Sequence, residues 1–167
     1  MTASTAPAIA PATYRIDATR STVRFVNKAM FGLFPVRGTF TVRDGTIVVA
    51  DDVTRSTVTA TLDAASVDTA NTRRDNDLRS KKYLHTARHP DISFASREVT
   101  PDSVTGILHV HGTDQRVTLT LTPESTPDGV RFTTSTRLDR YAFGVTGGKG
   151  LVARHVDVEL EIFASRA

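Results

Sequence analysis

The chain has 167 residues, of which 39% are hydrophobic and 23% are charged, and it contains no cysteine. This length and apolar content suit one domain with a buried core, and the lack of cysteine excludes disulfides, thiolate metal sites and a cysteine nucleophile. The net charge of +3 comes from arginines and lysines that are scattered along the chain, not gathered into a basic stripe, so we expect no nucleic-acid partner.

Residues 1–13 are expected to form a flexible arm, followed by one domain over residues 14–167. The first twelve residues are uncharged and rich in Ala, Pro, Ser and Thr, and Pro7 and Pro11 interrupt any apolar stretch of the kind that a secretory signal needs. No segment approaches the ~20 apolar residues of a membrane span. We therefore expect a cytoplasmic protein with no integral membrane segment, with a periplasmic or extracellular location as the alternative.

Most of the chain alternates apolar and polar residues, which is the period of a β-strand with one buried face. Residues 117–121 read Val-Thr-Leu-Thr-Leu, and residues 156–162 alternate apolar with acidic side chains. In chain order we predict strands at residues 14–17, 21–28, 36–43, 46–50, 56–63, 92–99, 104–111, 116–122, 130–138 and 155–163.

Turn signals separate these strands at intervals of about ten residues. Asp44-Gly45 predicts a hairpin between the third and fourth strands. Residues 101–103 (Pro-Asp-Ser) and 127–129 (Pro-Asp-Gly) predict two later turns. A sheet of many strands must avoid exposed edges, and closing the sheet on itself removes them. We therefore predict an all-β fold, an antiparallel barrel of about eight strands.

One stretch breaks the alternation. Residues 71–84 are polar and of mixed charge, and Leu78, Tyr83 and Leu84 could share one face of a helix. We predict a short helix that crosses one side of the barrel.

The histidines are candidates for a metal site. His109 and His111 lie two apart on a predicted strand and so share a face, but a site would need a third or fourth ligand. His85 and His89 are interpreted as surface or structural hydrogen-bonding groups. We expect no metal.

The sequence offers no catalytic constellation. It has no G-x-S-x-G or H-E-x-x-H motif, and the GGKG at residues 147–150 lacks the spacing of a phosphate-binding loop. Asp68 and Asp75 flank Arg73 and Arg74, and an Asp beside an Arg is stabilised in its charged form, which suits an ion pair. We predict no catalytic residues and no enzyme activity.

Residues 30–34 (Met-Phe-Gly-Leu-Phe), ahead of Pro35, are apolar or Gly without alternation. Such a segment at the mouth of a barrel could cap a cavity for a lipid, or it could belong to an ordinary core. The pattern alone leaves both open.

A series of short motifs carries a family resemblance, in its order and spacing more than in any single piece. The motifs are residues 14–17 (YRID), 21–25 (STVRF), 36–40 (VRGTF), 65–69 (ASVDT), Asn71, the Arg74-Asp75 pair, Leu78, 89–94 (HPDISF), 104–108 (VTGIL), 111–112 (HG) and 140–144 (RYAFG). Over residues 14–164 the chain resembles the YceI-like family of bacterial lipocalin-fold, polyisoprenoid-binding-like proteins.

The resemblance implies an extended lipocalin-like barrel with a helix across one side and an elongated apolar tunnel inside. It further implies a carrier of a long isoprenoid or lipid-like chain. The chain departs from the family pattern at two places where histidines are frequent: it has Lys28-Ala29-Met30 after the second strand, and Asp77 two residues after the Arg-Asp pair. These departures put the ligand's head group in doubt more than the fold.

We therefore expect a non-catalytic protein that binds, transports or stores one apolar small molecule, a polyisoprenoid or a fatty-acid-like ligand, with no cofactor. The alternatives are a stress-related interaction protein with a solid core and a small-molecule enzyme that uses the cavity; a homodimer is an alternative to a monomer. Arg74-Asp75 could instead be a structural pair that holds the helix to the barrel. The predicted ligand-binding residues are Phe25, Phe31, Phe34, Phe40, Leu62, Asn71, Arg74, Leu84, Phe94, Leu108, Phe132, Arg140 and Phe143.

Overall fold

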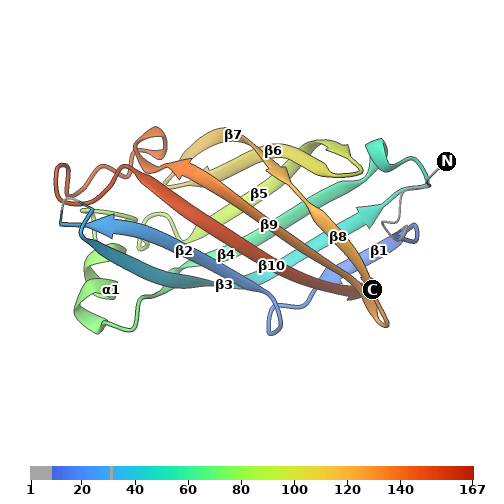
Figure 1. Ribbon diagram of the computed structural model, residues 1–167, viewed down its shortest axis with the longest axis horizontal. Helices are drawn as coiled ribbons and strands as arrows, with labels where there is room; N and C mark the ends of the chain where they lie inside the picture. Colours follow the sequence, from blue (N-terminus) through green and yellow to red (C-terminus); the bar gives the residue numbers. More distant parts are fainter. Residues whose placement is uncertain (1–8, 31) are drawn as a thin grey trace.

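A computed structural model describes residues 9–30 and 32–167. These residues form an elongated barrel of β-strands with one short α-helix at one end (Figure 1). The elements in chain order are β1 (Ala12–Ile16), β2 (Thr22–Ala29), β3 (Phe34–Val49), the 3-10 turn η1 (Val53–Arg55), β4 (Thr57–Asp68), α1 (Thr72–Arg79), β5 (Asp91–Thr100), β6 (Ser103–Val110), β7 (Thr113–Thr120), β8 (Thr122–Thr126), β9 (Gly129–Asp139), the 3-10 turn η2 (Arg140–Phe143) and β10 (His155–Arg166).

The predicted all-β antiparallel barrel is confirmed, and ten strands fill eight places around it. β1 and β2 both pair with β3 on one side and β10 on the other, so they share one place. β7 pairs with β6 and β8 pairs with β9, and the single residue Leu121 joins them, so they share another. The chain therefore closes the ring by passing from β6 to β9 along one split strand, in which β7 is hydrogen-bonded to β6 and β8 to β9.

The predicted hairpin at Asp44-Gly45 is wrong, because β3 runs straight through these two residues. Thr46 and Asp44 both pair with β4, and the register shifts between Val42 and Asp44, which marks a bulge. A Cβ at Gly45 would collide with the side chain of Ile16. Gly45 is thus required by a close approach inside the barrel, not by a turn.

The other turns follow the prediction, with one strand added. Residues 101–102 connect β5 to β6, and residues 127–128 connect β8 to β9. The sequence did not predict β8. Helix α1 is confirmed but ends at Arg79, so Leu78 is helical whereas Tyr83 and Leu84 lie in the turns that follow.

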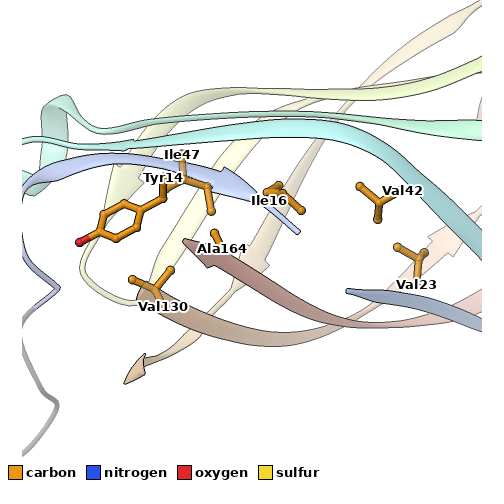
Figure 2. Packing of buried hydrophobic residues seen from close by; sticks show 7 residues of the cluster. All are labelled: Tyr14, Ile16, Val23, Val42, Ile47, Val130 and Ala164. Carbon is orange, nitrogen blue, oxygen red and sulfur yellow. The ribbon is translucent and has the colours of Figure 1, made fainter. Parts of the chain in front are cut away.

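The larger of two clusters of buried hydrophobic residues lies near β1 and the C-terminal strand β10 (Figure 2). Tyr14 is 2% exposed, and its hydroxyl donates to the carbonyl of Ala10 over 2.6 Å. We call this region, with Val130 and Ala164, the Tyr14 end. The cluster comprises Tyr14, Ile16, Val23, Val42, Ile47, Val130 and Ala164.

Candidate functional site

The barrel encloses an apolar cavity of about 460 Å³. The alternation of the strands explains its wall, because every second residue points inward and most of these residues are Val, Leu, Ile or Phe. The cavity ends before Tyr14, Val130 and Ala164, none of which lines it, whereas other members of the same cluster do. The Tyr14 end is therefore a solid plug.

Gly38 leaves room for an aromatic pair within the wall. A Cβ at this position would overlap the ring of Phe25. That ring packs against Phe40, with 5.4 Å between the ring centroids. The Gly in the VRGTF motif therefore lets an aromatic side chain lie flat against β3 beside the cavity.

Ten of the residues predicted to bind a ligand lie along the cavity wall. They come from strands, from α1, from η2 and from the turn after α1, so the barrel brings together positions that are far apart in the sequence. They are Phe25, Phe40, Leu62, Arg74, Leu84, Phe94, Leu108, Phe132, Arg140 and Phe143.

Two of the other three predicted residues, Phe34 and Asn71, do not line the cavity. Phe34 is 59% exposed. It lies on the same face of β3 as Val36 and Phe40, which do line the cavity, but it lies beyond the end of the barrel. Asn71 is exposed at the N-terminus of α1, where its side chain accepts from the backbone N–H of Arg74 over 3.0 Å, so it caps the helix. Phe31 lies outside the described residues.

The cavity reaches the surface beside α1. Asp77 is the one residue of the described wall that is exposed, and Arg74 and Leu78 of the same helix are also part of that wall. Opposite them, Asn27 and Ala29 line the cavity from the end of β2. We call this the α1 end of the barrel; the mouth lies between the helix and the β2–β3 tip.

Arg74 and Asp75 both bond to Thr69, at the end of β4. The Asp75 carboxylate accepts from the backbone N–H and the hydroxyl of Thr69 over 2.8 and 2.6 Å. Arg74 donates from Nε to the Thr69 hydroxyl and from Nη2 to its carbonyl, both over 2.8 Å. The pair thus fastens α1 to the barrel through a shared partner, while Arg74 also borders the cavity.

Arg140 is buried and holds the long loop between η2 and β10. Its guanidinium donates to the carbonyls of Val145, Val152 and Ala153 over 2.9, 3.0 and 2.9 Å. Burial lowers the pKa of Arg140 from its ordinary value, since no carboxylate contacts it among the described residues. This arginine therefore positions the backbone of the mouth, and it also lies on the cavity wall, where the predicted contact with a ligand stays a prediction.

Asn27 supports the same loop and was missed by the sequence reasoning. It is 8% exposed, and its side-chain amide donates to the carbonyls of Ala153 and His155 over 2.9 and 3.1 Å. A lone Asn at an inward position of β2 was the available signal. Asp77, Val145 and Val152 at the mouth were also missed as wall residues.

The histidines form a small cluster outside the cavity. His111 lies in the β6–β7 turn with a positive φ of 56°, so it does not share a strand face with His109. Its ring lies 4.7 Å from that of His89, which lies 5.8 Å from that of His85. His109 instead pairs with Asp114 over 2.6 Å. Within residues 9–30 and 32–167, no three His, Asp or Glu side chains are grouped so as to hold a metal ion.

Comparison with protein families and sequences gives a consistent result. The YceI-like domain model matches residues 14–164. Protein YceI of Escherichia coli O6:H1 is 38% identical over 87 residues, which are 49% of this chain and 46% of that protein. A UPF0312 protein of Staphylococcus epidermidis is 32% identical over 103 residues, covering 59% of this chain and 58% of its own. The matched part thus spans about half the length of these relatives.

Solved structures share the fold at low sequence identity. Burkholderia cenocepacia BcnA superposes with a TM-score of 0.78 at 22% identity, covering 88% of this chain and 98% of that one. A polyisoprenoid binding domain from Saccharophagus degradans gives a TM-score of 0.74 at 14% identity, covering 95% and 100%. Among the helices that the structure describes, none is long and apolar enough to cross a bilayer.

Proposed function

The chain belongs to the YceI-like domain family, and we propose that it binds one elongated apolar molecule, of isoprenoid or lipid type, inside its barrel without transforming it. The observation that carries this proposal is the apolar cavity of about 460 Å³. Small-molecule sites typically measure ~300–1,000 Å³ and are lined mainly by hydrophobic side chains. A cavity of this size also argues against the solid-core alternative.

The wall supports an apolar ligand over a polar one. Most side chains on the wall are aliphatic or aromatic, and the two charged residues of α1 on it, Arg74 and Asp77, lie at the mouth. Burying each methylene of a ligand chain would contribute roughly 0.8 kcal/mol. A chain lying along the barrel would gain this along its whole length, with its tail toward the Tyr14 end.

The mouth supports a polar end on the ligand. Asp77 is free of any ion pair among the described residues, and the Arg74 guanidinium keeps part of its donor capacity after bonding Thr69. A ligand hydroxyl could donate to Asp77 or accept from Arg74.

Binding without catalysis is supported by the chemistry of the wall. Its inward hydroxyls, Thr134 and Thr136, lie on β9, and neither donates to or accepts from a histidine or carboxylate among the described residues. Nucleophilic catalysis by a hydroxyl requires such an activating base. The Saccharophagus degradans structure of the same fold is named as a binding domain, which agrees with this proposal.

Two neighbouring residues of β4 allow a matched test. Ala60 lines the cavity, whereas Thr59 is exposed on the outer face. We expect native mass spectrometry of protein from its own host to show a bound apolar molecule, and polyprenyl alcohols or fatty acids to raise Tm. Stabilisation reaches about 2.7 kcal/mol when the free ligand is at 100 times its Kd.

Ala60→Phe places a ring inside the cavity, so it should obstruct an elongated ligand and abolish both signals, while Thr59→Phe should retain them. A wild-type protein that is always empty and gains no Tm from either ligand class would refute the proposal. Equal binding by both variants would place the ligand elsewhere.

A further inference from the structure

Four large apolar side chains are exposed together at the α1 end. Leu33 is 74% exposed, Phe34 59%, and Met30 and Leu151 49% each. Among the described residues the other exposed large hydrophobic residue is Val48, near the end of β3 that pairs with β1. Single exposed apolar residues are ordinary, but a group of four in one place marks an interaction surface.

The backbone holds these four side chains close to one another. Three of them belong to the β2–β3 tip and the fourth to the loop between η2 and β10 (Figure 1). Ala29 forms a β-bridge with Val152, and the N–H of Ala153 donates to the carbonyl of Lys28 over 2.7 Å. The two segments are therefore joined beside the mouth. We call Met30, Leu33, Phe34 and Leu151 the apolar rim.

Positive charge surrounds the apolar rim. Residues 27–38, 79–90 and 140–156, which supply the tip, the turn after α1 and the long loop, contain no Asp or Glu. Lys28 and Lys149 are exposed next to the rim, and neither forms an ion pair with another described residue. Lys82 is exposed where its backbone approaches Gly147 of the loop. The carboxylates on the surface of this end are Asp77 of α1, and Asp139 and Asp157, which are paired with Arg154 and Arg137.

We propose that the apolar rim docks onto the surface of an anionic lipid bilayer, with the lysines against the lipid phosphates and the mouth toward the membrane. Exposed aliphatic and aromatic tips can enter the headgroup boundary, and basic side chains beside them are attracted to anionic lipids. At the opposite Tyr14 end, Val48 alone is exposed among the described large hydrophobic residues. Docking depends on the rim and not on whether the cavity holds a ligand.

A second copy of the chain fits this surface less well. In a symmetric dimer the same patch meets itself, so Lys28 and Lys149 of one copy would face the lysines of the other. Like charges across an interface disfavour association, whereas phosphates neutralise them. Charge complementarity therefore favours the bilayer as the partner.

Vesicle flotation tests the proposal directly. We expect the wild-type protein to float with vesicles of phosphatidylcholine and phosphatidylglycerol and to bind far less to phosphatidylcholine alone. Replacing Leu33 and Leu151 by Ser should weaken binding about tenfold per residue. Val48→Ser, which changes an exposed apolar residue away from the rim, should leave binding unchanged.

The lysines give a second, separable measurement. Lys28→Gln and Lys149→Gln should each weaken binding to the anionic vesicles about fivefold, and raising the salt concentration should reduce the difference from wild type. All these side chains are exposed, so each variant should melt as the wild type does. The cavity variant Ala60→Phe should still float, which separates docking from ligand binding.

Three results would overturn the proposal. They are a wild-type protein that does not bind anionic vesicles, a Leu33→Ser/Leu151→Ser variant that binds as the wild type does, and a rim that instead controls oligomeric state. The last would appear by light scattering as a wild-type dimer that the double variant converts to a monomer, without vesicle binding by either protein.

Discussion

The two ends of the barrel are built from different contacts, although the same alternating strands run through both. At the Tyr14 end, apolar side chains bury one another: Tyr14 and Val130 are 2% and 1% exposed. At the α1 end the buried groups include Asn27, Asp75 and Arg140, each bonded to loop or strand-end backbone, while large apolar side chains face outward.

This difference shows how one barrel can be closed at one end and open at the other. Close packing of apolar groups leaves no space and makes a plug. Hydrogen bonds from buried polar side chains to carbonyls have fixed directions and hold loops at a distance from the axis, so they can frame an opening. The Tyr14 end therefore carries stability, and the α1 end carries the proposed functions.

Truncating the plug should produce the largest effect on stability. Tyr14→Ala removes a buried aromatic ring and its hydroxyl bond to Ala10, so we expect it to lower the free energy of unfolding by about 3–5 kcal/mol in a urea titration. Tyr14→Phe keeps the ring and should cost only about 1 kcal/mol. Similar losses for both variants would show that the hydroxyl bond, not packing, secures this end.

Removing the main support of the mouth should have the next largest effect. Arg140→Met leaves the carbonyls of Val145, Val152 and Ala153 without their donor, and we expect a loss of about 2–4 kcal/mol in unfolding free energy. Limited proteolysis should show new cleavage within residues 145–152. Arg140→Lys should restore little, because one ammonium cannot reproduce the planar fork of donors. Unchanged cleavage would mean that the loop is held by other contacts.

The contrast between the ends also explains what the sequence could predict. The strands were predictable because strict alternation along one strand reports its buried face without knowledge of its neighbours. Most of the apolar wall follows from the same rule. The rule fails for Phe34. This residue is on the inward face of β3, but alternation does not show where the strand extends beyond the end of the barrel.

The features that the sequence predicted wrongly or did not reveal depend on residues far away in the chain. Gly45 follows Asp44 in a pattern typical of a hairpin, yet it is small because Ile16 approaches it across the barrel. Asn27 bonds to Ala153, 126 positions away, and Arg140 bonds to carbonyls of a loop that has no regular pattern. Strand β8 has the sequence Thr-Pro-Glu-Ser-Thr, which carries no apolar alternation.

The pH dependence of stability should report on the α1 end. Asp139 accepts from Arg154 Nε and Nη2 over 2.9 and 2.7 Å and from the Tyr141 N–H, and these partners lower its pKa to about 2 from 3.8. A carboxyl with a lowered pKa stabilises the fold above pH 3.8, and this contribution is lost as the pH falls toward about 2.

Asp139→Asn should therefore flatten the decline in Tm between pH 4 and pH 2, while lowering Tm at pH 7. Asp128→Asn is the control, since Asp128 pairs with Arg20 over 3.0 Å in the turn between β8 and β9, next to Val130 at the Tyr14 end. If both variants flatten the decline equally, the sensitivity to acid belongs to the whole sheet and not to the α1 end.

The smallest effect should come from the histidine cluster, at higher pH. Partial burial and the neighbouring His111, His85, Arg88 and His109 lower the pKa of His89 below its usual 6.5. The folded protein therefore favours neutral His89, and the unfolded chain takes up the proton first as the pH falls below 6.5. Stability should be complete above this pH and decline slightly as the pH falls below 6.5.

His89→Asn removes the titrating ring, so the urea midpoint of this variant should change less between pH 8 and pH 5 than that of the wild type. His155→Asn, at the start of β10 and outside the cluster, should keep the wild-type slope. Protonation of the histidine cluster should loosen the turn after α1 and the β6–β7 turn but not the Tyr14 end. Lowering the pH from 8 to 5 should therefore increase hydrogen exchange at residues 85–89 and not at Tyr14. Equal increases at both sites would show that acid weakens the barrel as one unit, and the two ends would then be coupled more tightly than their separate contacts indicate.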